Sequence, residues 1–559
     1  MVENSLGRLW LEGHPNAELH DGWKYYLDEA EQESEVEAQL AKLREEYKTI
    51  KPEEIKVIDP CMGSGHILVY AFDVLMQIYT SAGWDQREAA QSILKNNLYG
   101  LDIDDRAAQL AYFAVMMKAR QYDRRLLTRG IQPNIYSIRE SNGIQAMTIE
   151  YFHKNDPKLK ADIERIVTEM RDAKEYGSIL NITPVDCTGL YARFDEIRED
   201  INMMQMSALD ELLPLVKCAE LLAQKYDVVV TNPPYMSSSN MGASLLKFIK
   251  KNYPEGKNDL FSAFMQKCLD LSEKNGFLSM ITMHSWMFLS RYQSLRLLIL
   301  NYCIENIMHL GTKAFDDIGG EVVQTSAFII KKTHLSDYVG RYEKLTELND
   351  TASKIQHFNN LDFSHYCHQK NYHYMVDNII AYWISDKIGA HFSTTPLLGS
   401  AVDCRQGIAT GNNDMFLRFW YEAELCNINF HATSQNDMII SGKLYAPYNK
   451  GGSYRRWFGN REYVIKIDAT NYNILLTMGN HLPSRQFYYR SGITWNDVST
   501  APYCARIEAL LHFASDFTNC VILNFSSGIE FPFFNSKTAC FDDVQKMLSL
   551  MERGINETK

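Results

Sequence analysis

The stretch "IKVIDPCMGSGHILVYAFDVLMQIY", Ile55–Tyr79, decides the fold that this sequence predicts. It opens with a short β-branched run ending at Asp59, passes through a turn that contains two glycines, and continues as an apolar segment of helical length, His66–Tyr79. β-Branched residues favour strands, and glycine permits the tight turn from a strand into a helix. A strand, a glycine turn and a helix in this order are typical of a parallel α/β sheet.

The segments on either side continue this rhythm. A helical pattern, "DQREAAQSILKN", precedes "LYGLDID", a short strand that again ends in acid, and a long helical pattern, "DDRAAQLAYFAVMMKARQY", follows. The runs "YDVVVTNPPY", "GFLSMITMHSWMFL" and "TSAFIIKK" predict further strands, whereas residues 143–225 are polar and helical in pattern. We therefore predict an α/β fold: a doubly wound, mostly parallel Rossmann-like sheet with a helical insertion.

The composition changes after about Lys332 toward aromatics, asparagine and glycine, with short runs and frequent turn signals. Residues 397–535 are typical of mixed β structure with irregular loops. We place a domain boundary between residues 333 and 395. The predicted domains are 1–335, which holds the parallel sheet, and 336–559, an α+β domain.

Length and composition narrow the class of protein. A chain of 559 residues, 46% hydrophobic and 23% charged, predicts two or more globular domains. The formal net charge of −12 argues against coating nucleic acid by bulk electrostatics, although a local basic groove remains compatible with it. The 11 cysteines are scattered without a CxxC pair, which fits reduced thiols in a cytosol.

Neither a metal site nor a membrane segment is predicted. The nearest sequence to a metal cluster is "HYCH", His365–His368, which we interpret as ordinary surface. No apolar run approaches the roughly 18 to 20 residues that cross a bilayer, and no signal peptide is evident. We therefore expect a soluble, cytoplasmic protein.

The glycine turn "DPCMGSGH", Asp59–His66, is a candidate ligand site. Gly63 and Gly65 let a ligand approach the backbone, and the helix that follows offers its N-terminal amide groups. Glycine turns after strands are common, so a purely structural role is equally compatible with this turn alone. The turn lacks the GK[ST] ending of a nucleotide-triphosphate loop, which argues against phosphate transfer.

The acid of "GLDID", Gly100–Asp104, ends the neighbouring predicted strand. At that position Asp102 can accept hydrogen bonds from both ribose hydroxyls of an adenosine-containing cofactor, and Ile103 can pack on the adenine. The alternative is a helix cap, for which Asp104 and Asp105 are well placed. Both roles are compatible, with Asp102 for the ligand and the later acids for the helix.

The run "YDVVVTNPPYM", Tyr226–Met236, ends a buried strand with unusual residues. The Asn232 side-chain oxygen and a backbone carbonyl held by Pro233 and Pro234 can both accept hydrogen bonds from an exocyclic amine, which raises the electron density of its nitrogen. Tyr235 offers a ring on which a flipped base can stack, worth about 1 to 3 kcal/mol. These residues predict a pocket for an adenine that donates its amine to an electrophile.

In this order, "DPCMGSG", "GLDID" and "NPPY" resemble motifs I, II and IV of the amino-group DNA methyltransferases, whose cofactor is S-adenosylmethionine. The wider segments "TNPPYMSSSNMG", "ITMHSWMFLSRYQSLR", "GGEVVQTSAFII" and "GIATGNNDMFLRFW" resemble the PglX (BrxX) family, the adenine-specific methyltransferases of BREX phage-defence systems. The resemblance covers nearly the whole chain. It implies a site-specific DNA adenine-N6 methyltransferase.

The resemblance also implies roles for individual residues. The methionine end of the cofactor would be lined by Asp59, Cys61, Gly63 and Gly65, and its ribose and adenine by Asp102 and Ile103. In "RESNG", either Glu140 or Asn142 would serve as the third cofactor motif. The target adenine would be held by Asn232, Pro233, Pro234 and Tyr235, with Phe328 stacked on its other face.

The sequence departs from the family in one respect. Relatives place a "YTP" motif upstream of "NSLGRLWLE", whereas this chain begins at "MVENSLGRLW". An alternative function is therefore a catalytically impaired fragment that acts as a DNA-recognition component of a defence complex. A third hypothesis is an RNA or protein methyltransferase, since "NPPY" also activates amide nitrogens and RNA bases.

Two segments of the second predicted domain are candidates for DNA contacts. "KGGSYRRWFGNR" and "RQFYYR" interleave cations with aromatic rings and glycine turns. Their candidate residues for phosphates or guanine edges are Lys450, Arg455, Arg456, Arg485 and Arg490. We expect double-stranded DNA as the partner, with other defence-system proteins as further partners, and a target-recognition role for this domain. The alternative is surface arginine beside core aromatics.

Overall fold

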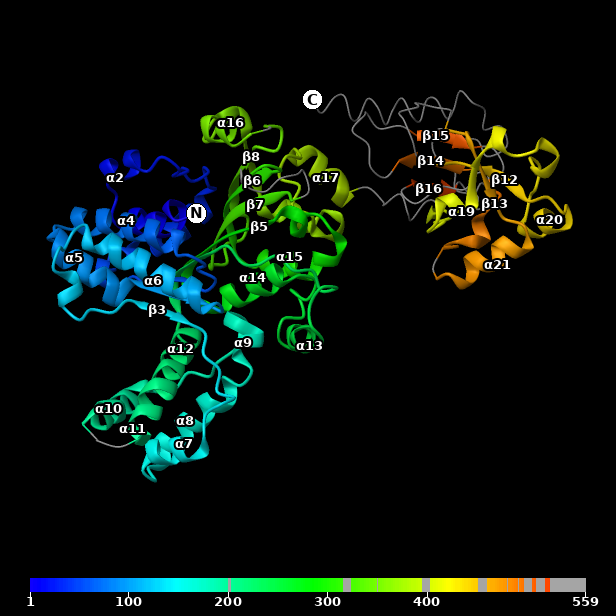
Figure 1. The fold of residues 1–559 in the computed structure, drawn as a ribbon. Coiled ribbons are helices and arrows are strands. Elements are labelled where there is room, and N and C mark those ends of the chain that lie inside the picture. The colour runs from blue at the N-terminus through cyan, green and yellow to red at the C-terminus, as the bar shows by residue number, and fades with distance from the viewer. Residues whose placement is uncertain are drawn as a thin grey trace. The chain divides into compact units, whose positions relative to one another are not determined.

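The computed structural model describes residues 1–199, 203–314, 323–348, 350–394, 403–450, 460–479, 481–490, 492–496, 505–508 and 518–522. The chain divides into two units, Met1–Ser393 and Thr394–Lys559 (Figure 1). This division comes later than residue 335, because two strands beyond that position, β8 (Val339–Lys344) and β9 (Ser364–His368), hydrogen-bond into the sheet of the first unit.

The first unit is built on a nine-stranded sheet with the order β3-β2-β1-β4-β5-β7-β6-β8-β9. Strands β3, β2, β1, β4 and β5 are parallel, and β7 runs antiparallel to both of its neighbours. The remaining bounds are β1 Val57–Asp59, β2 Leu98–Asp102, β3 Asn134–Ser137, β4 Tyr226–Thr231, β5 Ser272–Met283, β6 Cys303–Gly311 and β7 Thr325–Lys331. The predicted fold class, a doubly wound and mostly parallel sheet, is confirmed.

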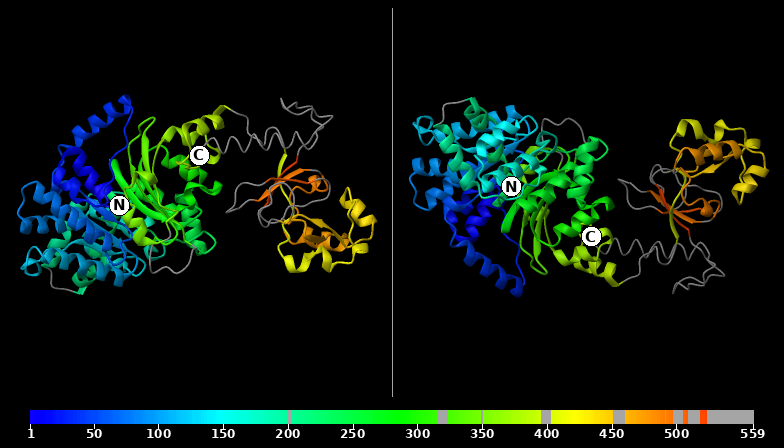
Figure 2. Two further views of the ribbon diagram at one scale, coloured as in Figure 1. Left: turned by 90° about the horizontal axis from the view of Figure 1, so that it is seen from above. Right: turned by 90° about the horizontal axis from the view of Figure 1, so that it is seen from below.

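Helices cover both faces of this sheet (Figure 2). Side chains alternate between the faces along each strand, so Val57 of β1 joins one hydrophobic core and Ile58 joins the other. The core around Val57 includes residues of α4 (His66–Ser81), α5 (Gln86–Ser92) and α6 (Asp105–Arg120). The core around Ile58 includes residues of α12 (Leu213–Ala223), α14 (Leu260–Leu271) and α15 (Gln293–Ile299).

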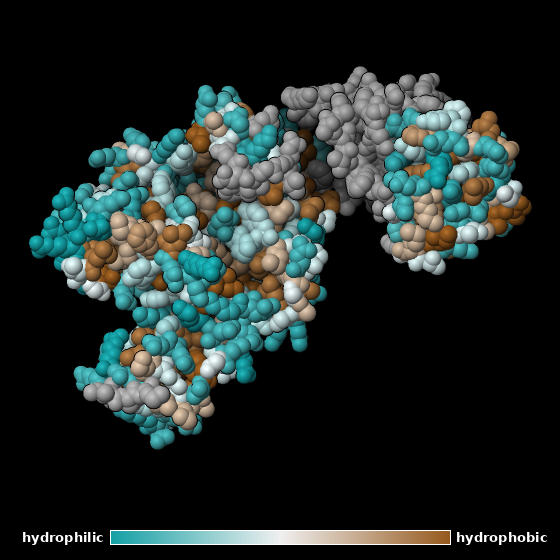
Figure 3. All heavy atoms as spheres, in the orientation of Figure 1, coloured by the Kyte–Doolittle hydropathy of each residue, from teal (hydrophilic) through white to brown (hydrophobic). Residues whose placement is uncertain are grey.

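The predicted helical insertion is present between β3 and β4. Its helices before α12 are α7 Ala146–His153, α8 Pro157–Glu169, α9 Ala173–Tyr176, α10 Cys187–Arg198 and α11 Met203–Ser207. Most of them form a lobe that projects from the sheet (Figure 1), with Phe152 and Phe194 in contact at 4.6 Å between ring centroids. On the face drawn in Figure 3, this lobe and the sheet-bearing part are largely polar, with hydrophobic side chains in scattered groups.

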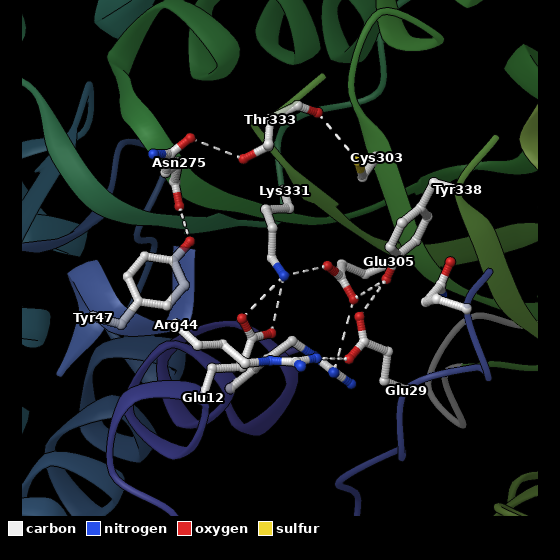
Figure 4. Close-up of polar contacts among 12 residues, drawn as sticks. Glu12, Glu29, Arg44, Tyr47, Asn275, Cys303, Glu305, Lys331, Thr333 and Tyr338 are labelled. Carbon is white, nitrogen blue, oxygen red and sulfur yellow. Dashed lines mark hydrogen bonds and ion pairs between the residues drawn. The ribbon is translucent and has the colours of Figure 1, made fainter. Parts of the chain in front are cut away.

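The N-terminal helices bind to strands that come about 300 residues later. Lys331 of β7 lies 3.0 Å from Glu12 and 2.8 Å from Glu305 of β6, and its side chain is fully buried (Figure 4). The Tyr338 hydroxyl donates to Glu305 at 2.7 Å. The helices that supply charged residues to this network are α1 (Arg8–Gly13), with Arg8 and Glu12, and α3 (Ser34–Tyr47), with Arg44; α2 (Ala17–Gly22) lies between them in the sequence. A buried ionic network therefore joins the start of the chain to the outer strands of the sheet.

The second unit contains two small antiparallel sheets and short helices. One sheet has the order β10-β16-β14-β15 and the other β11-β13-β12. Their bounds are β10 Asp403–Gln406, β11 Leu417–Phe419, β12 Tyr445–Tyr448, β13 Tyr463–Lys466, β14 Gly492–Asn496, β15 Ala505–Glu508 and β16 Thr518–Ile522. Helices α20 (Gln435–Ile440) and α21 (Ala469–Thr477) contribute Met438 and Leu475 to its core. This mixture agrees with the predicted α+β composition.

Candidate active site

The carboxyl ends of β1, β2 and β4 meet at one edge of the first sheet. β1 pairs in parallel with β2 on one side and with β4 on the other, so the strand order reverses beside β1. Ligands of doubly wound sheets bind at such a reversal, outside the carboxyl ends of the strands. Asp59, Asp102 and Thr231 are the last residues of these three strands. The predicted cofactor turns and the predicted target loop therefore share one edge.

Asp59 is a buried carboxyl group with one unsatisfied oxygen. Its Oδ1 atom accepts hydrogen bonds from the Thr231 hydroxyl at 2.7 Å and from the backbone N–H of Cys61 at 3.0 Å. Its Oδ2 atom has no hydrogen-bond partner among the described residues, although the residue is only 1% exposed. Burial raises the pKa of Asp59 to about 7, against the opposing effect of these two hydrogen bonds. A ligand that brings a cation or an N–H donor would satisfy the free oxygen.

Gly63 and Gly65 of the first turn are glycine for different structural reasons. Gly63 has a φ of +52°, and a Cβ atom built on it meets nothing within 4 Å. Gly65 has a φ of +86°, and a Cβ atom there would lie 2.9 Å from the Cα of Ala111 in α6. Gly65 therefore lets α4 pack closely on α6, whereas Gly63 leaves open space beside the turn.

Asp102 links the two cofactor turns. Its Oδ2 atom accepts from the backbone N–H of Gly63 at 2.9 Å, and its Oδ1 atom accepts from the N–H of Asp104 at 2.9 Å. A carboxylate has about four lone-pair positions, so both oxygens retain capacity for ribose hydroxyls. Asp104 caps α6 by accepting from the N–H groups of Arg106 and Ala107. Ile103 is 45% exposed, as a residue that packs on a ligand should be.

The two candidates for the third cofactor motif, Glu140 and Asn142, lie in different environments. Asn142 is exposed, its amide donates to Asp172 Oδ1 at 2.7 Å, and its oxygen accepts from the Asp172 N–H at 2.8 Å. Both ends of this side chain are thus engaged with the insertion. Glu140 is exposed. Of the two predicted candidates, Glu140 is the better placed to exchange solvent for a ligand.

The target loop follows β4 directly. Asn232 and Pro234 are exposed, Pro233 is buried and Tyr235 is half-buried. The Tyr235 hydroxyl makes long hydrogen bonds to Asn232 Oδ1 (3.4 Å) and to the carbonyl of Ile281 (3.3 Å). Bonds of that length are weak, so an incoming amine can displace the tyrosine from the asparagine oxygen.

Tyr235 is oriented by the core beneath it. Its ring meets Phe261 of α14 edge-on, with 6.0 Å between centroids and 80° between planes. The next residue, Met236, donates its N–H to Asp259, the N-cap of α14, at 3.1 Å. Burial raises the pKa of Tyr235 above its usual range, so the hydroxyl stays protonated at neutral pH. The loop is therefore held on both sides of the tyrosine.

Phe328 does not face this site. It was predicted to stack on the second face of the adenine, but it has no exposed surface and lies edge-on to Trp286 at 5.1 Å. The physical reason is the position of β7 between β5 and β6, where both faces of the strand are covered. Phe328 is a core residue in this structure.

Three polar contacts at this edge come from residues that the sequence analysis does not identify. The first is the hydrogen bond from Thr231 to Asp59 described above. In the other two, the Ser178 hydroxyl donates to the carbonyl of Pro60 at 2.6 Å, and Lys174 Nζ donates to the carbonyl of Ile103 at 2.7 Å. Ser178 and Lys174 belong to the insertion, more than 65 residues from the turns that they contact. The position of Thr231 at the end of β4, next to the target loop, is a weak sequence signal for a site residue. No local pattern identifies Ser178 or Lys174 as site residues.

In the second unit, the structure describes three of the five predicted DNA-contact residues. Lys450 Nζ lies 4.9 Å from the centre of the Tyr463 ring, and the Arg490 guanidinium lies 5.5 Å from that of Phe487. Arg485 and Arg490 are exposed. Arg455 and Arg456 lie outside the described residues. Cations stacked on aromatic rings present their charge in a fixed direction.

Across the part of the chain that the structure describes, no three His, Cys, Asp or Glu side chains are grouped as a metal site would require. Within the same residues, no helix combines the length and apolar character of a membrane span.

Residues 96–315 match the Eco57I restriction-modification methylase family. This span contains β2, the helical insertion, β4 and the target loop. The match therefore falls within the first unit and includes the strands and the loop of the candidate site.

Two curated relatives extend the likeness over most of the chain. The chain is 37% identical over 541 residues to the adenine-specific methyltransferase PglX of Lacticaseibacillus casei (strain Zhang), an alignment that covers 90% of the chain and 44% of that protein. It is also 37% identical over 532 residues to the adenine-specific methyltransferase BrxX of Escherichia coli O9:H4 (strain HS), covering 90% of the chain and 43% of that protein. The resemblance to the PglX (BrxX) family is confirmed, and the chain spans less than half the length of these relatives.

Solved structures show a more distant likeness. The Type IIL restriction-modification enzyme MmeI in complex with DNA has a TM-score of 0.46 and 11% identity, covering 92% of this chain and 60% of that one. Similarity of that degree does not identify a reaction.

Proposed function

We propose that this chain is the methyltransferase part of a site-specific, adenine-specific DNA methyltransferase. It transfers a methyl group from S-adenosylmethionine to N6 of an adenine flipped out of duplex DNA, within a phage-defence system related to restriction-modification. The observation that carries the proposal is the placement of Asp59, with its unsatisfied buried oxygen, and of Asn232 at the ends of the adjacent strands β1 and β4. The 37% identity to PglX and BrxX supports the adenine substrate.

The residues at the carboxyl ends of β1 and β2 fit the cofactor. Asp59 Oδ2 would accept from the amino group of the methionine end, and the open space at Gly63 would admit that end beside the backbone. Asp102 would accept from the ribose hydroxyls, and Ile103 would cover the adenine. When bound, S-adenosylmethionine supplies a methyl group activated by a sulfonium. We assign Glu140 to the adenine amine of the cofactor, because Asn142 is engaged with Asp172.

The target loop would hold and activate the amine. Asn232 Oδ1 and the Pro233 carbonyl would each accept one N–H of the exocyclic amine, which raises the electron density of its nitrogen as that nitrogen attacks the methyl carbon. Pro234 fixes the direction of the carbonyl before it, because proline has a fixed φ. Stacking on Tyr235, worth about 1 to 3 kcal/mol, would offset part of the few kcal/mol needed to flip the base. Transfer would break the bond between the methyl carbon and the sulfonium sulfur and release S-adenosylhomocysteine, and the methylated amine would then lose one proton to solvent.

We propose a DNA-contact role for the exposed Arg485 and Arg490 and the partly exposed Lys450 of the second unit. Lys450, Arg485 and Arg490 would meet phosphates or base edges, and Arg455 and Arg456 remain candidates from the sequence. This unit would then select the recognised sequence. Other proteins of the defence system would be further partners.

The test is a transfer assay with the purified chain, labelled S-adenosylmethionine and mixed-sequence duplex DNA. The wild type should produce labelled N6-methyladenine, and Asn232→Ala should lower the rate at least about 100-fold, because an acceptor of the reacting amine is lost. Asn301→Ala is a matched control, since Asn301 is exposed and its side-chain amide donates to the nearby carbonyls of Leu297 and Leu298. It should act at the wild-type rate.

Calorimetry with S-adenosylmethionine distinguishes the proposed methyltransferase from the alternative function, a DNA-recognition fragment. DNA binding by a chain that neither binds the cofactor nor transfers a methyl group would contradict the proposal and support a DNA-recognition fragment. Equal rates for Asn232→Ala and the wild type would contradict the assigned target loop.

A further inference from the structure

The helical insertion returns to the cofactor edge through one short segment. We call residues Asp172–Ile179 the return segment; it contains α9 and the short 3-10 turn Gly177–Ile179. It begins at Asp172 with a φ of 55° and bends again at Gly177 with a φ of 62°. These left-handed residues turn the chain sharply, so that the segment lies across the two cofactor turns.

The return segment bonds to both cofactor turns. The Ser178 hydroxyl, which is 2% exposed, donates to the carbonyl of Pro60 in the first turn at 2.6 Å. Lys174 Nζ donates to the carbonyl of Ile103 in the second turn at 2.7 Å and to Asp105 Oδ1 at 2.9 Å. The hydrogen bond from Lys174 is the first cause of the lowered pKa of Asp105. One side chain thus fixes the backbone of the residue expected to cover the adenine.

The return segment is also anchored independently of Lys174. At its start, Asp172 and Asn142 exchange two hydrogen bonds, of 2.7 Å and 2.8 Å. At its centre, the Tyr176 ring stacks on Phe248 of α13 (Ala243–Asn252) with 4.4 Å between centroids. Ser178 holds its end. Removal of the lysine amine therefore leaves the segment in place while releasing the Ile103 carbonyl.

We propose that the return segment is a positioning element of the cofactor site and that Lys174 sets the affinity for the adenosine part of the cofactor. This inference rests on the proposed function. Lys174 holds the carbonyl of Ile103 and the first turn of α6, so the neighbouring Asp102 carboxylate and the Ile103 side chain stay in the orientation that a nucleoside needs. Charge-assisted bonds of this kind are stronger than neutral ones.

The structure separates this role from a stabilising one. The Lys174 side chain is 32% exposed, and an ion pair with that access to water contributes little to the free energy of unfolding. A loss of affinity without a loss of stability is therefore expected. A residue that merely held the fold together would change both.

The experiment compares Lys174→Met with Lys158→Met in the full chain. Lys158 is the matched control: it is also a lysine of the insertion, and its Nζ lies 2.9 Å from a carboxylate, Asp186, that takes no part in the cofactor turns. Isothermal calorimetry measures the dissociation constants of S-adenosylmethionine and of adenosine alone, and thermal unfolding gives Tm.

Lys174→Met should weaken both ligands about tenfold, with Tm within about 2 °C of the wild type. Lys158→Met should change neither quantity, and Lys174→Arg should restore most of the affinity, because the cation is retained. Equal S-adenosylmethionine affinity in the two methionine variants would overturn the inference. A wild type that binds no S-adenosylmethionine would instead overturn the proposed function on which the inference rests.

Discussion

Replacement of Asp59 by asparagine should remove a pH-dependent loss of stability. The pKa of this buried carboxyl group rises from 3.8 to about 7 on folding, mainly through burial. A folded pKa above the unfolded one favours the folded state below about pH 4, where both states are protonated, and this advantage is lost as the pH rises through about 7. Asparagine can keep the oxygen that accepts from Thr231 and Cys61 but does not titrate.

The magnitude follows from the difference in bound protons. Between about pH 5 and pH 7 the unfolded carboxyl is ionised while the folded one is largely protonated, a difference of nearly one proton. Each pH unit then changes the free energy of unfolding by about 1.4 kcal/mol. Between pH 5 and pH 8 the wild type should therefore lose about 2 to 3 kcal/mol relative to Asp59→Asn.

Urea unfolding of both proteins without cofactor, at pH 5 and pH 8, measures this difference. The comparison between the two pH values is the result that matters, because the new amide group at position 59 changes the absolute stability equally at both. A difference between wild type and variant that does not change with pH would refute the reasoning. It would mean that Asp59 is already ionised at pH 5 in the folded chain.

Two further pairs of variants test the turn and the ionic network. Gly65→Ala should lower stability by about 1 to 3 kcal/mol, because its Cβ would press on Ala111, whereas Gly63→Ala should cost about 1 kcal/mol and mainly weaken S-adenosylmethionine binding in calorimetry. Lys331→Met should cost about 3 to 5 kcal/mol in urea unfolding, because buried Glu12 loses its cation and buried Glu305 loses the nearer of its two cations. Lys344→Met, at a partly exposed lysine, should cost less than about 1 kcal/mol. Equal losses within either pair would contradict the packing described.

The sequence predicts the inner half of the sheet because its signals are local. β1, β2 and β4 each end in a residue pattern that specifies a turn, so their positions and their shared edge follow from a few neighbouring letters. These local patterns predict Asp59, Asp102 and Asn232 as site residues. Their side chains reach the edge in the structure because parallel strands present their carboxyl ends together.

Among the outer strands, "TSAFIIKK" predicts β7, but β6, β8 and β9 could not be predicted in the same way. β6 contains Glu305 and His309, polar residues that look unsuited to a fully buried strand. Their partners are distant in sequence: Lys331 binds Glu305, and His309 bonds to His284 and Tyr382. Local patterns carry no information about such pairs.

The site shows the same contrast. An apolar strand that contains Phe328 predicts a buried residue as well as it predicts a stacking one, and the covered position of β7 decides between them. Lys174 is the converse case: it contacts the site but is not predicted to, because a lysine in a polar helical segment is usually a surface residue. Its role depends on where the insertion returns, which only the folded chain determines.

The ionic network at the N-terminus also has a consequence for synthesis on the ribosome. Gln32 exchanges two hydrogen bonds with Val339, 307 residues later, and Glu12 meets Lys331 across 319 residues. At about 5 to 20 residues per second, these partners emerge roughly 15 to 60 seconds after the helices that need them. When these helices emerge from the ribosome, Glu12 and the apolar side chains that are buried in the folded protein are still exposed to solvent. Nascent chains of this protein should therefore be good clients of chaperones until β7 and β8 have been made.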